Sequence, residues 1–213
     1  HVRKAEVPDY TAIACDARVD CSEVEDRYQL LDRLPKHGVV CEVGVFKGDF
    51  SAKIIERNAP RKLHLIDPWV HQDLRLWKKR TNEFHMNCLS NVQARFTQDV
   101  ADRRVIVHRG YSADILSLFP ENYFDWVYLD GDHTYKTVRL ELELLDSRVK
   151  KGGYILGHDF IKPELYPPER KDDFQVVQAV TDFCDVHDWQ LSFQTPDQSP
   201  GSKACPTFLL ERT

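Results

Sequence analysis

The sequence predicts an α/β fold with a mainly parallel, seven-stranded sheet and helices on both faces. Short apolar runs alternate with amphipathic stretches of helical period along most of the chain. The chain then closes with two strand-like runs that have no helix between them. Right-handed crossovers place the carboxyl ends of parallel strands at one edge of the sheet. We therefore expect the functional residues directly after positions 43, 66, 108, 129 and 156.

Length and composition indicate one globular domain. The chain has 213 residues, of which 42% are hydrophobic and 30% charged, so it is long enough to bury a sizeable core. We expect an irregular N-terminal segment over residues 1–21 and a single domain over residues 22–213. The sequence has no run of roughly 18 apolar residues to span a bilayer and no signal-peptide core. Its six cysteines form no CxxC pair, which favours free thiols and a cytoplasmic protein without membrane contact.

The charge balance argues against nucleic acid as a partner. Lys and Arg number 29 against 34 Asp and Glu, which gives a formal net charge of -5. A non-specific nucleic-acid binder needs a basic stripe to release counterions from the phosphates. We therefore expect a small-molecule substrate, and a homodimer as the commonest form of self-association.

Caps, prolines and glycines bound the predicted elements. Ser22-Glu23-Val24-Glu25 has the pattern of a capping box, which predicts a helix that begins there and ends near Pro35 and Gly38. Residues 70–80 and 161–172 show no clean period and are predicted to be irregular. The remaining elements are predicted as strands at 39–43, 62–66, 104–108, 124–129, 154–156, 189–194 and 206–211, and helices at 51–57, 83–96, 113–118, 135–148 and 174–187. Gly152 and Gly153 are expected to stop the helix before the fifth strand.

A glycine-containing turn, Glu42-Val43-Gly44-Val45-Phe46-Lys47-Gly48, contains the end of the first strand. Glycines permit a tight turn and close approach of the backbone to a ligand, and the next helix offers free amides. Phe46 occupies a position where a dinucleotide-binding GxGxxG motif requires glycine, so its side chain should obstruct a pyrophosphate. A cofactor with an adenosine but no phosphates does not need that glycine.

Asp67 and Ser112 follow the second and third strands. Asp67 lies 23 positions beyond Gly44, where an acidic residue can accept both hydroxyls of a ribose. An Asp before Pro68 also starts turns, but its pairing with the glycine turn favours ribose binding. Ser112 can cap a helix, or it can present its hydroxyl and the following amides to an adenine edge.

These residues, together with Tyr128-Leu129-Asp130-Gly131-Asp132-His133 and Gly152-Gly153-Tyr154-Ile155-Leu156-Gly157-His158-Asp159, resemble a class I S-adenosylmethionine-dependent methyltransferase over residues 38–160. More narrowly, they resemble the small-molecule O-methyltransferase branch that includes macrolide-sugar methyltransferases and cephalosporin-biosynthesis proteins. The resemblance implies a Rossmann-like class I methyltransferase fold with S-adenosylmethionine as cofactor. It implies cofactor contacts at Glu42, Gly44, Val45, Phe46, Gly48, Ser51, Asp67, Pro68, Ser112 and Asp130.

The resemblance also implies a divalent metal, Mg²⁺ or Mn²⁺, held by Asp130, His158 and Asp159, and a catalytic base at His133 assisted by Asp130. Physical reasoning supports part of this set. Asp130 and Asp159 should end adjacent strands, and two converging carboxylates need a cation or a shared proton. His158 departs from the family pattern, which more often has a carboxylate there. An imidazole favours Mn²⁺, Fe²⁺ or Zn²⁺, unless His158 is not a ligand at all.

Several aromatic and basic residues are candidates for substrate contact. Trp69, Trp77, Tyr135 and Tyr166 could form a pocket rim, since aromatic side chains give a large contact area, although such residues more often pack in a core. Lys78-Lys79-Arg80 fits a solvated helix face, and it could also meet an acidic substrate.

The predicted function is methyl transfer from S-adenosylmethionine to a hydroxyl oxygen of a small molecule. Two other functions stay open at this point. One is a nicotinamide-dependent oxidoreductase, against which Phe46 argues. The other is a non-catalytic partner protein that binds S-adenosylmethionine, which the unusual His158 keeps open.

Overall fold

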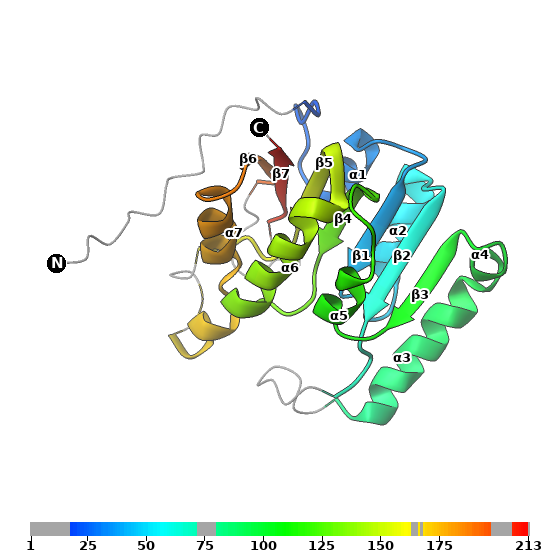
Figure 1. Cartoon of the computed structure of the whole chain (residues 1–213). Coiled ribbons are helices and arrows are strands. Elements are labelled where there is room, and N and C mark those ends of the chain that lie inside the picture. Colours follow the sequence, from blue (N-terminus) through cyan, green and yellow to red (C-terminus); the bar gives the residue numbers. More distant parts are fainter. Residues whose placement is uncertain (1–17, 72–79, 163–165, 167, 197–205, 213) are drawn as a thin grey trace.

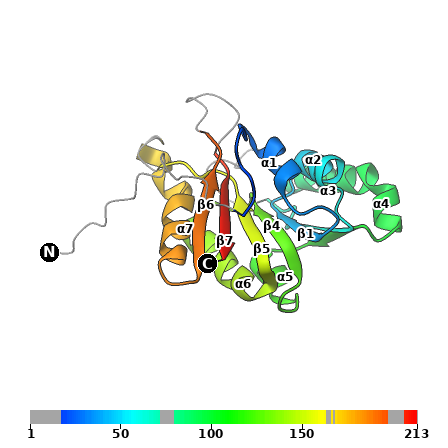
Figure 2. The same cartoon turned by 90° about the horizontal axis from the view of Figure 1, so that it is seen from above.

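The computed structural model of the chain describes residues 18–71, 80–162, 166, 168–196 and 206–212. One central sheet carries helices on both faces (Figures 1 and 2). Residues 1–17 of the expected irregular segment, and most of the 70–80 segment, lie outside the described residues.

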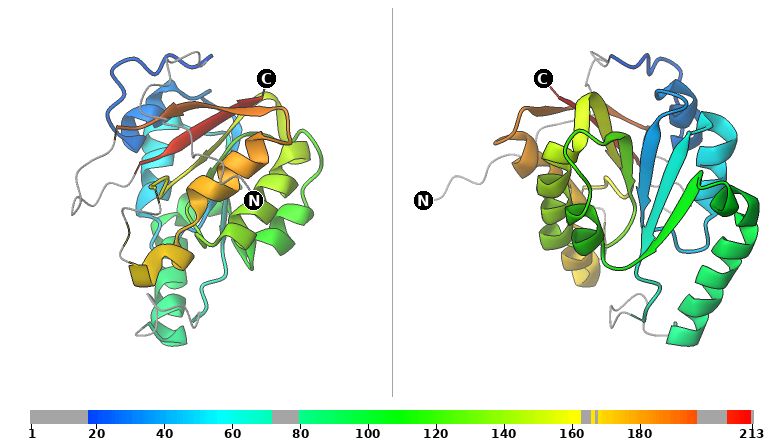
Figure 3. Two further views of the ribbon diagram at one scale, coloured as in Figure 1. Left: turned by 90° about the vertical axis from the view of Figure 1, so that its left-hand side faces the viewer. Right: turned by 45° about the vertical axis from the view of Figure 1, so that its right-hand side comes forward.

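The sheet has seven strands in the order β3-β2-β1-β4-β5-β7-β6. The pairs among the first five strands are parallel, and β7 runs antiparallel to both β5 and β6. The blue, cyan and green strands β1, β2 and β3 run side by side in the right-hand view of Figure 3. This arrangement confirms the predicted fold. The strands are β1 Val39–Val43, β2 Lys62–Asp67, β3 Val105–Arg109, β4 Phe124–Leu129, β5 Val149–Gly157, β6 Trp189–Gln194 and β7 Phe208–Arg212.

The strand order reverses between β1 and β4, because the chain passes outward from β1 to β3 and returns to pair β4 with β1. Ligands of open α/β sheets bind at the carboxyl edge beside such a reversal. The fold therefore points to the ends of β1 and β4 as the place to look for a site.

An apolar core lies on each face of the sheet, where side chains of the strands pack against side chains of the helices. One core packs α1, α2 and α3 against one face, and the other packs α5, α6 and α7 against the opposite face. Burial of these apolar surfaces is the main source of the fold's stability. The helices are α1 Arg27–Arg33, α2 Asp49–Asn58, α3 Asn82–Arg95, α4 Thr97–Ala101, α5 Ser112–Ser117, α6 Tyr135–Arg148 and α7 Val176–Cys184.

The capping box predicted at residues 22–25 is wrong. Helix α1 begins at Arg27, and the carboxylate of Asp26 accepts hydrogen bonds from the backbone of Tyr28 and Gln29. Ser22 instead donates its hydroxyl and its amide to Asp20. An Asp next to the helix outcompetes the Ser because it satisfies two free amides at once.

Two boundaries also differ from the prediction. The glycines at 152–153 lie inside β5, at an irregularity in its pairing with β4, and do not stop the preceding helix. There a Cβ on Gly153 would lie only 2.6 Å from the carbonyl oxygen of Asp125, so this position requires glycine. The segment predicted as irregular at 161–172 contains a short 3₁₀ helix, Pro168–Asp173.

Where the structure describes the chain, no helix combines the length and the apolar character needed to cross a membrane. Among the described residues, Cys41, Cys88 and Cys184 are free thiols, as predicted.

A buried histidine in β2 makes the fold sensitive to acid. The Nδ1 atom of His64 lies 2.8 Å from Nε2 of His108, and its Nε2 atom lies 3.1 Å from the hydroxyl of Tyr123. Burial, together with the charge of His108, lowers the pKa of His64 from 6.5 to about 3. His64 is therefore neutral in the folded protein at pH values where the unfolded chain already takes up a proton.

We expect the free energy of unfolding to fall as the pH drops from about 6.5 toward 3, by up to ~1.4 kcal/mol per pH unit. The unfolded state binds the additional proton in this window, so acid favours it. Urea denaturation at several pH values should give a shallower slope for His64→Phe than for the wild type. The control His37→Phe changes an exposed histidine. An unchanged slope in His64→Phe would contradict this account.

Candidate functional site

A cavity of about 420 Å³ lies at the carboxyl edge of the sheet, beside the reversal of strand order. Ligand pockets typically measure roughly 300–1,000 Å³, so a small molecule fits. The turn after β1, the end of β2, the loop after β3, the loop after β4 and one face of α6 form its walls. The predicted cofactor positions that line it are Gly44, Phe46, Asp67, Pro68, Ser112 and Asp130.

Gly44 brings the turn after β1 against the end of β4. Its φ is +88°, and a Cβ at this position would lie 2.0 Å from the carbonyl oxygen of Asp130. The amide of Gly44 donates to Ile66, and the amide of Asp130 donates to Val43. Only glycine combines this φ with so close a backbone contact.

Asp67 is held in a fixed orientation at the end of β2. Its carboxylate accepts hydrogen bonds from the amides of Phe46, at 2.9 Å, and Trp69, at 2.7 Å. Burial raises the pKa of Asp67, and these backbone bonds oppose the shift. The imidazole of His85, a residue that the sequence analysis missed, lines the cavity on the same side. A backbone hydrogen bond from Val45 also lowers the pKa of Asp67, and the carboxylate still has acceptor capacity for a further donor.

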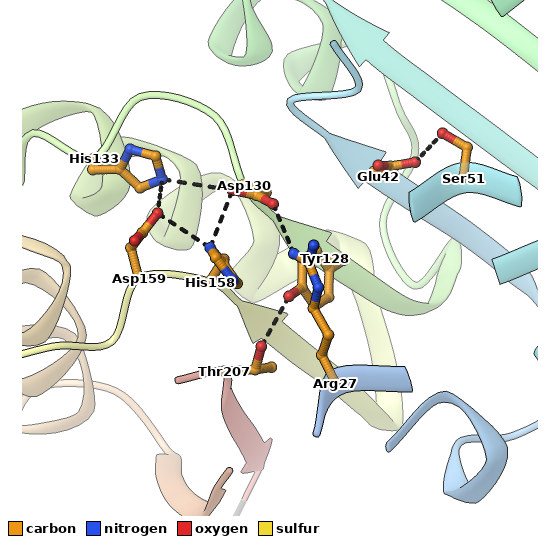
Figure 4. Close-up of polar contacts among 9 residues, drawn as sticks. All are labelled: Arg27, Glu42, Ser51, Tyr128, Asp130, His133, His158, Asp159 and Thr207. Carbon is orange, nitrogen blue, oxygen red and sulfur yellow. Dashed lines mark hydrogen bonds and ion pairs between the residues drawn. The ribbon is translucent and has the colours of Figure 1, made fainter. Parts of the chain in front are cut away.

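Four predicted cofactor positions do not line the cavity. Glu42 is buried in β1 and accepts a hydrogen bond from the hydroxyl of Ser51 in α2 (Figure 4). Burial raises the pKa of Glu42 to about 8. Val45 packs into the core with α1–α3, and Gly48 precedes α2 in a left-handed conformation. Cofactor contact at these four positions stays a prediction.

Ser112 is the first residue of α5, and the capping position belongs to Tyr111, so the interpretation of Ser112 as a helix cap is wrong. Its side chain hydrogen-bonds with the carboxyl group of Glu141, which is buried in α6 and lines the same cavity. Burial raises the pKa of Glu141 to about 7, and the hydrogen bond with Ser112 opposes this shift. Glu141 is a further residue that the sequence analysis missed.

Four polar side chains after β4 and β5 converge on one another (Figure 4). Two of them, Asp130 and His133, line the cavity. The Nε2 atom of His133 lies 2.9 Å from Oδ2 of Asp159 and 3.7 Å from Oδ1 of Asp130. The Nδ1 atom of His158 lies 3.2 Å and 3.6 Å from the same two oxygens. The structure thus brings together all four residues predicted as base or metal ligands, which we call the His–Asp cluster: Asp130, His133, His158 and Asp159.

Within this cluster, Asp130, His133 and Asp159 each offer one ligand atom, and the three atoms lie within 4.8 Å of one another. This set contains His133 where the sequence analysis expected His158. The Nε2 atom of His133 faces both carboxylates, so one atom would have to serve as metal ligand and as base. The ligand role that this geometry offers to His133 and its predicted role as base therefore exclude each other at any one moment.

The His–Asp cluster balances its own charges. Burial lowers the pKa of His133, but Asp130 and Asp159 outweigh it and raise the value to about 10. For Asp159 the two effects have the opposite signs. Burial raises its pKa, but the interactions with His133 and His158 are stronger and hold this pKa well below its usual range. A protonated His133 and an ionised Asp159 therefore form an ion pair at neutral pH.

Arg27, the first residue of α1, adds a positive charge beside Asp130. Its Nη1 atom lies 3.2 Å from Oδ2 of Asp130, and its guanidinium lies over the ring of Phe50, 4.6 Å from the centroid. Figure 4 shows Arg27 reaching the cluster from α1. No local pattern in the sequence marks this position, because an Arg in the first turn of a helix is commonplace.

The predicted aromatic rim is largely wrong. Trp69 is fully buried, and its indole donates to the carbonyl of Phe46. Tyr135 donates to Asp182 and does not line the cavity. Tyr166 stacks on Phe174, which in turn stacks on His133, with centroid separations of 4.4 and 5.3 Å.

The basic run is described only in part. Trp77, Lys78 and Lys79 lie outside the described residues. The guanidinium of Arg80 lies over the ring of Phe46, 4.6 Å from the centroid, and not on a solvated helix face.

Comparison with solved structures places this fold among methyltransferases. A candidate rRNA methylase from Clostridium thermocellum superposes with a TM-score of 0.59 at 13% identity, covering 87% of this chain and 95% of that chain. A candidate methyltransferase from Streptococcus mutans, in complex with SAH, gives 0.58 at 12% identity, with coverages of 87% and 95%. An N-methyltransferase from Bradyrhizobium japonicum gives 0.58 at 13% identity, with coverages of 87% and 94%. At such identities the likeness concerns the fold alone.

Among curated proteins, an uncharacterized protein of Acanthamoeba polyphaga mimivirus is 32% identical over 138 residues. The match covers 61% of this chain and 57% of the viral protein. A family model described as a methyltransferase domain matches residues 41–160, which is more than half of the chain and includes the glycine turn, Asp67 and the His–Asp cluster. The chain therefore belongs to this methyltransferase-domain family and has the class I S-adenosylmethionine-dependent methyltransferase fold.

Proposed function

We propose that this protein transfers a methyl group from S-adenosylmethionine to a hydroxyl oxygen of a small molecule, with a divalent cation at the His–Asp cluster. The observation that carries the proposal is the joining of two features in one cavity. Asp67, a carboxylate suited to a ribose, lines this cavity, and so do Asp130 and His133 of the His–Asp cluster.

The cavity residues fit the cofactor. The amides of Phe46 and Trp69 fix both oxygens of Asp67, and its remaining acceptor capacity would serve ribose hydroxyls. Gly44 lets the turn lie directly against the backbone of Asp130, so that both belong to the lining of one cavity. When bound, S-adenosylmethionine supplies an electrophilic methyl group on its sulfonium. The tasks of the chain are then alignment, exclusion of water and handling of the acceptor proton.

The donor set of the cluster fits a divalent cation. Two carboxylates and one imidazole offer atoms within 4.8 Å of one another. Mixed oxygen and nitrogen donors favour Mn²⁺ over Mg²⁺. Asp130, His133 and Asp159 would hold such a cation, which would supply a Lewis acid that lowers the pKa of a hydroxyl oxygen.

The chain's own residues determine the form of the cluster. Arg27 pairs with Oδ2 of Asp130, which leaves Oδ1 toward the two histidines, so we assign Arg27 as a positioning residue. The proton on Nε2 of His133 must leave before this atom can bind a cation or accept the proton of a hydroxyl. We assign His133 to the ligand set, and retain it as the base only for a reaction without a cation.

A hydroxyl acceptor explains why the cluster is needed. An alcohol does not give up its proton at neutral pH without help, whereas a neutral amine or a thiolate can attack directly. The formal net charge of -5 favours a small molecule over an RNA, although the structural relatives include a candidate rRNA methylase.

We expect Asp67→Ala to weaken the binding of S-adenosylhomocysteine by roughly 10- to 100-fold, because hydrogen bonds to a charged group contribute about 1.5–3 kcal/mol. Isothermal titration calorimetry measures this directly. Asp32→Ala is the control, since this exposed carboxylate pairs with Arg57 away from the cavity. Wild-type affinity in Asp67→Ala would contradict the proposed site, and tight binding of NADH in place of S-adenosylhomocysteine would revive an oxidoreductase.

We expect the wild type to bind Mn²⁺ and Asp159→Asn to bind it at least about tenfold more weakly, because a ligand charge is lost. Calorimetry with Mn²⁺ tests this, with Asp182→Asn as a control, since that carboxylate pairs with Tyr135 outside the cluster. The geometry predicts a greater loss for His133→Ala than for His158→Ala.

Methyl transfer from labelled cofactor to a panel of small alcohols and phenols should fall with EDTA and recover with Mn²⁺. A rate of methyl transfer that is unchanged by EDTA would remove the cation from the proposal and leave His133 as the base. Cofactor binding without transfer to any hydroxyl would favour the non-catalytic partner protein.

A further inference from the structure

The imidazole of His133 has polar contacts at one of its two nitrogens. Its Nε2 atom lies 2.9 Å from Oδ2 of Asp159 and 3.7 Å from Oδ1 of Asp130, and Figure 4 shows both contacts at this nitrogen. Among the residues that the structure describes, no group hydrogen-bonds with Nδ1 of His133. A histidine that binds a metal ordinarily donates its second nitrogen to a carboxylate, a carbonyl or water, which fixes the ring. An orientation of this ring that is set by the chain itself therefore needs another kind of contact.

An aromatic stack lies against this imidazole. The ring of Phe174 is nearly parallel to that of His133, with an interplanar angle of 17° and a centroid separation of 5.3 Å. Tyr166 stacks on Phe174 at an interplanar angle of 16°. Phe174 has an exposed fraction of 7%, so the close-packed interior leaves its ring little room to move. A turn of the imidazole about its Cβ–Cγ bond would therefore lose the favourable stacked contact.

The connection from β5 to α7 contacts His133 near both of its ends. Near its start lies Asp159, whose carboxylate pairs with Nε2 of His133. At its end lie Phe174, on the ring, and Gln175, whose amide donates to the carbonyl oxygen of His133 at 2.8 Å. The side-chain oxygen of Gln175 also accepts a hydrogen bond from the amide of Tyr135, at 3.2 Å. The hydrogen bonds of Gln175 fix the backbone around His133, whereas Phe174 is the contact that bears on the plane of its ring.

We propose that Phe174, packed against Tyr166, is a positioning residue that keeps Nε2 of His133 directed at Asp130 and Asp159. This inference rests on the proposed function, in which His133 is a cation ligand or, without a cation, the base. It assigns to an aromatic ring the role that a hydrogen bond at the second nitrogen has for other histidine ligands. A turned imidazole would remove one of the three ligand atoms that now lie within 4.8 Å of one another.

The first part of the test uses Mn²⁺ as the probe, at one fixed pH. Phe174→Leu keeps an apolar side chain but removes the ring, so calorimetry should show Mn²⁺ bound at least about fivefold more weakly than by the wild type. Tyr166→Leu should change the affinity in the same direction, and it provides a second variant if Phe174→Leu does not fold. The matched control is Phe183→Leu, because Phe183 stacks on His187 outside the His–Asp cluster, with 4.5 Å between the centroids. This control should lower the melting temperature and keep the affinity within about twofold.

The second part is a crystal structure of Phe174→Leu without any cation, which shows the orientation of the ring directly. The inference predicts that Nε2 of His133 has left Oδ2 of Asp159, or that the imidazole occupies two orientations. An imidazole that keeps its wild-type position would overturn the positioning role of Phe174. Wild-type affinity for Mn²⁺ in both Phe174→Leu and Tyr166→Leu would also overturn it.

The outcomes separate this inference from the proposed function. A wild type that binds no Mn²⁺ would remove the cation from the proposed function, and the crystal structure of Phe174→Leu would still decide the role of Phe174. Mn²⁺ binding that is equally tight in the wild type and in Phe174→Leu would support the cation site and overturn the inference. A merely structural Phe174 would behave like Phe183, with a lower melting temperature and an unchanged affinity.

Discussion

The two halves of the site depend on one backbone contact, between Gly44 after β1 and Asp130 after β4. The contact is so close that a Cβ at Gly44 would lie 2.0 Å from the carbonyl oxygen of Asp130. It joins the glycine turn, whose amide at Phe46 holds Asp67, to the strand end that carries Asp130. Because β1 and β4 are neighbours at the reversal of strand order, the fold itself brings the cavity and the His–Asp cluster together. A side chain at Gly44 would separate these two parts.

Charge balance is the second constraint on the site. Converging carboxylates at Asp130 and Asp159 predict a cation or a shared proton, and the structure meets that need with basic groups of the chain. Arg27 pairs with Asp130, and His133 pairs with Asp159. A divalent cation would therefore have to displace the proton of His133, which couples metal affinity to pH. Repulsion between the carboxylates alone does not require a metal, so the proposal depends on the convergence of the ligand atoms.

The sheet and the residues at the strand ends could be predicted from the sequence, because hydrophobic period and strand termini are local properties. Asp67 and Asp130 could be identified as cavity residues because Asp67 ends a buried strand and Asp130 directly follows one. Arg27 and Glu141 could not, because their roles depend on which helix face meets the cavity, a property of packing between distant segments. The expectation that Trp69 forms part of a pocket rim was wrong for the same reason, because the burial of Trp69 depends on how the turn around Phe46 folds. The prediction of a capping box at Ser22 was wrong because the side chain of Asp26, closer to the helix, caps α1 instead.

A crystal structure with S-adenosylhomocysteine and Mn²⁺ tests most directly whether the cofactor and a cation bind next to each other at this site. The account predicts the ribose against Asp67, and an anomalous manganese peak among Asp130, His133 and Asp159. A nucleoside bound elsewhere would contradict the account. Manganese bound away from the cluster, with His133 still paired to Asp159, would contradict the metal-assisted mechanism.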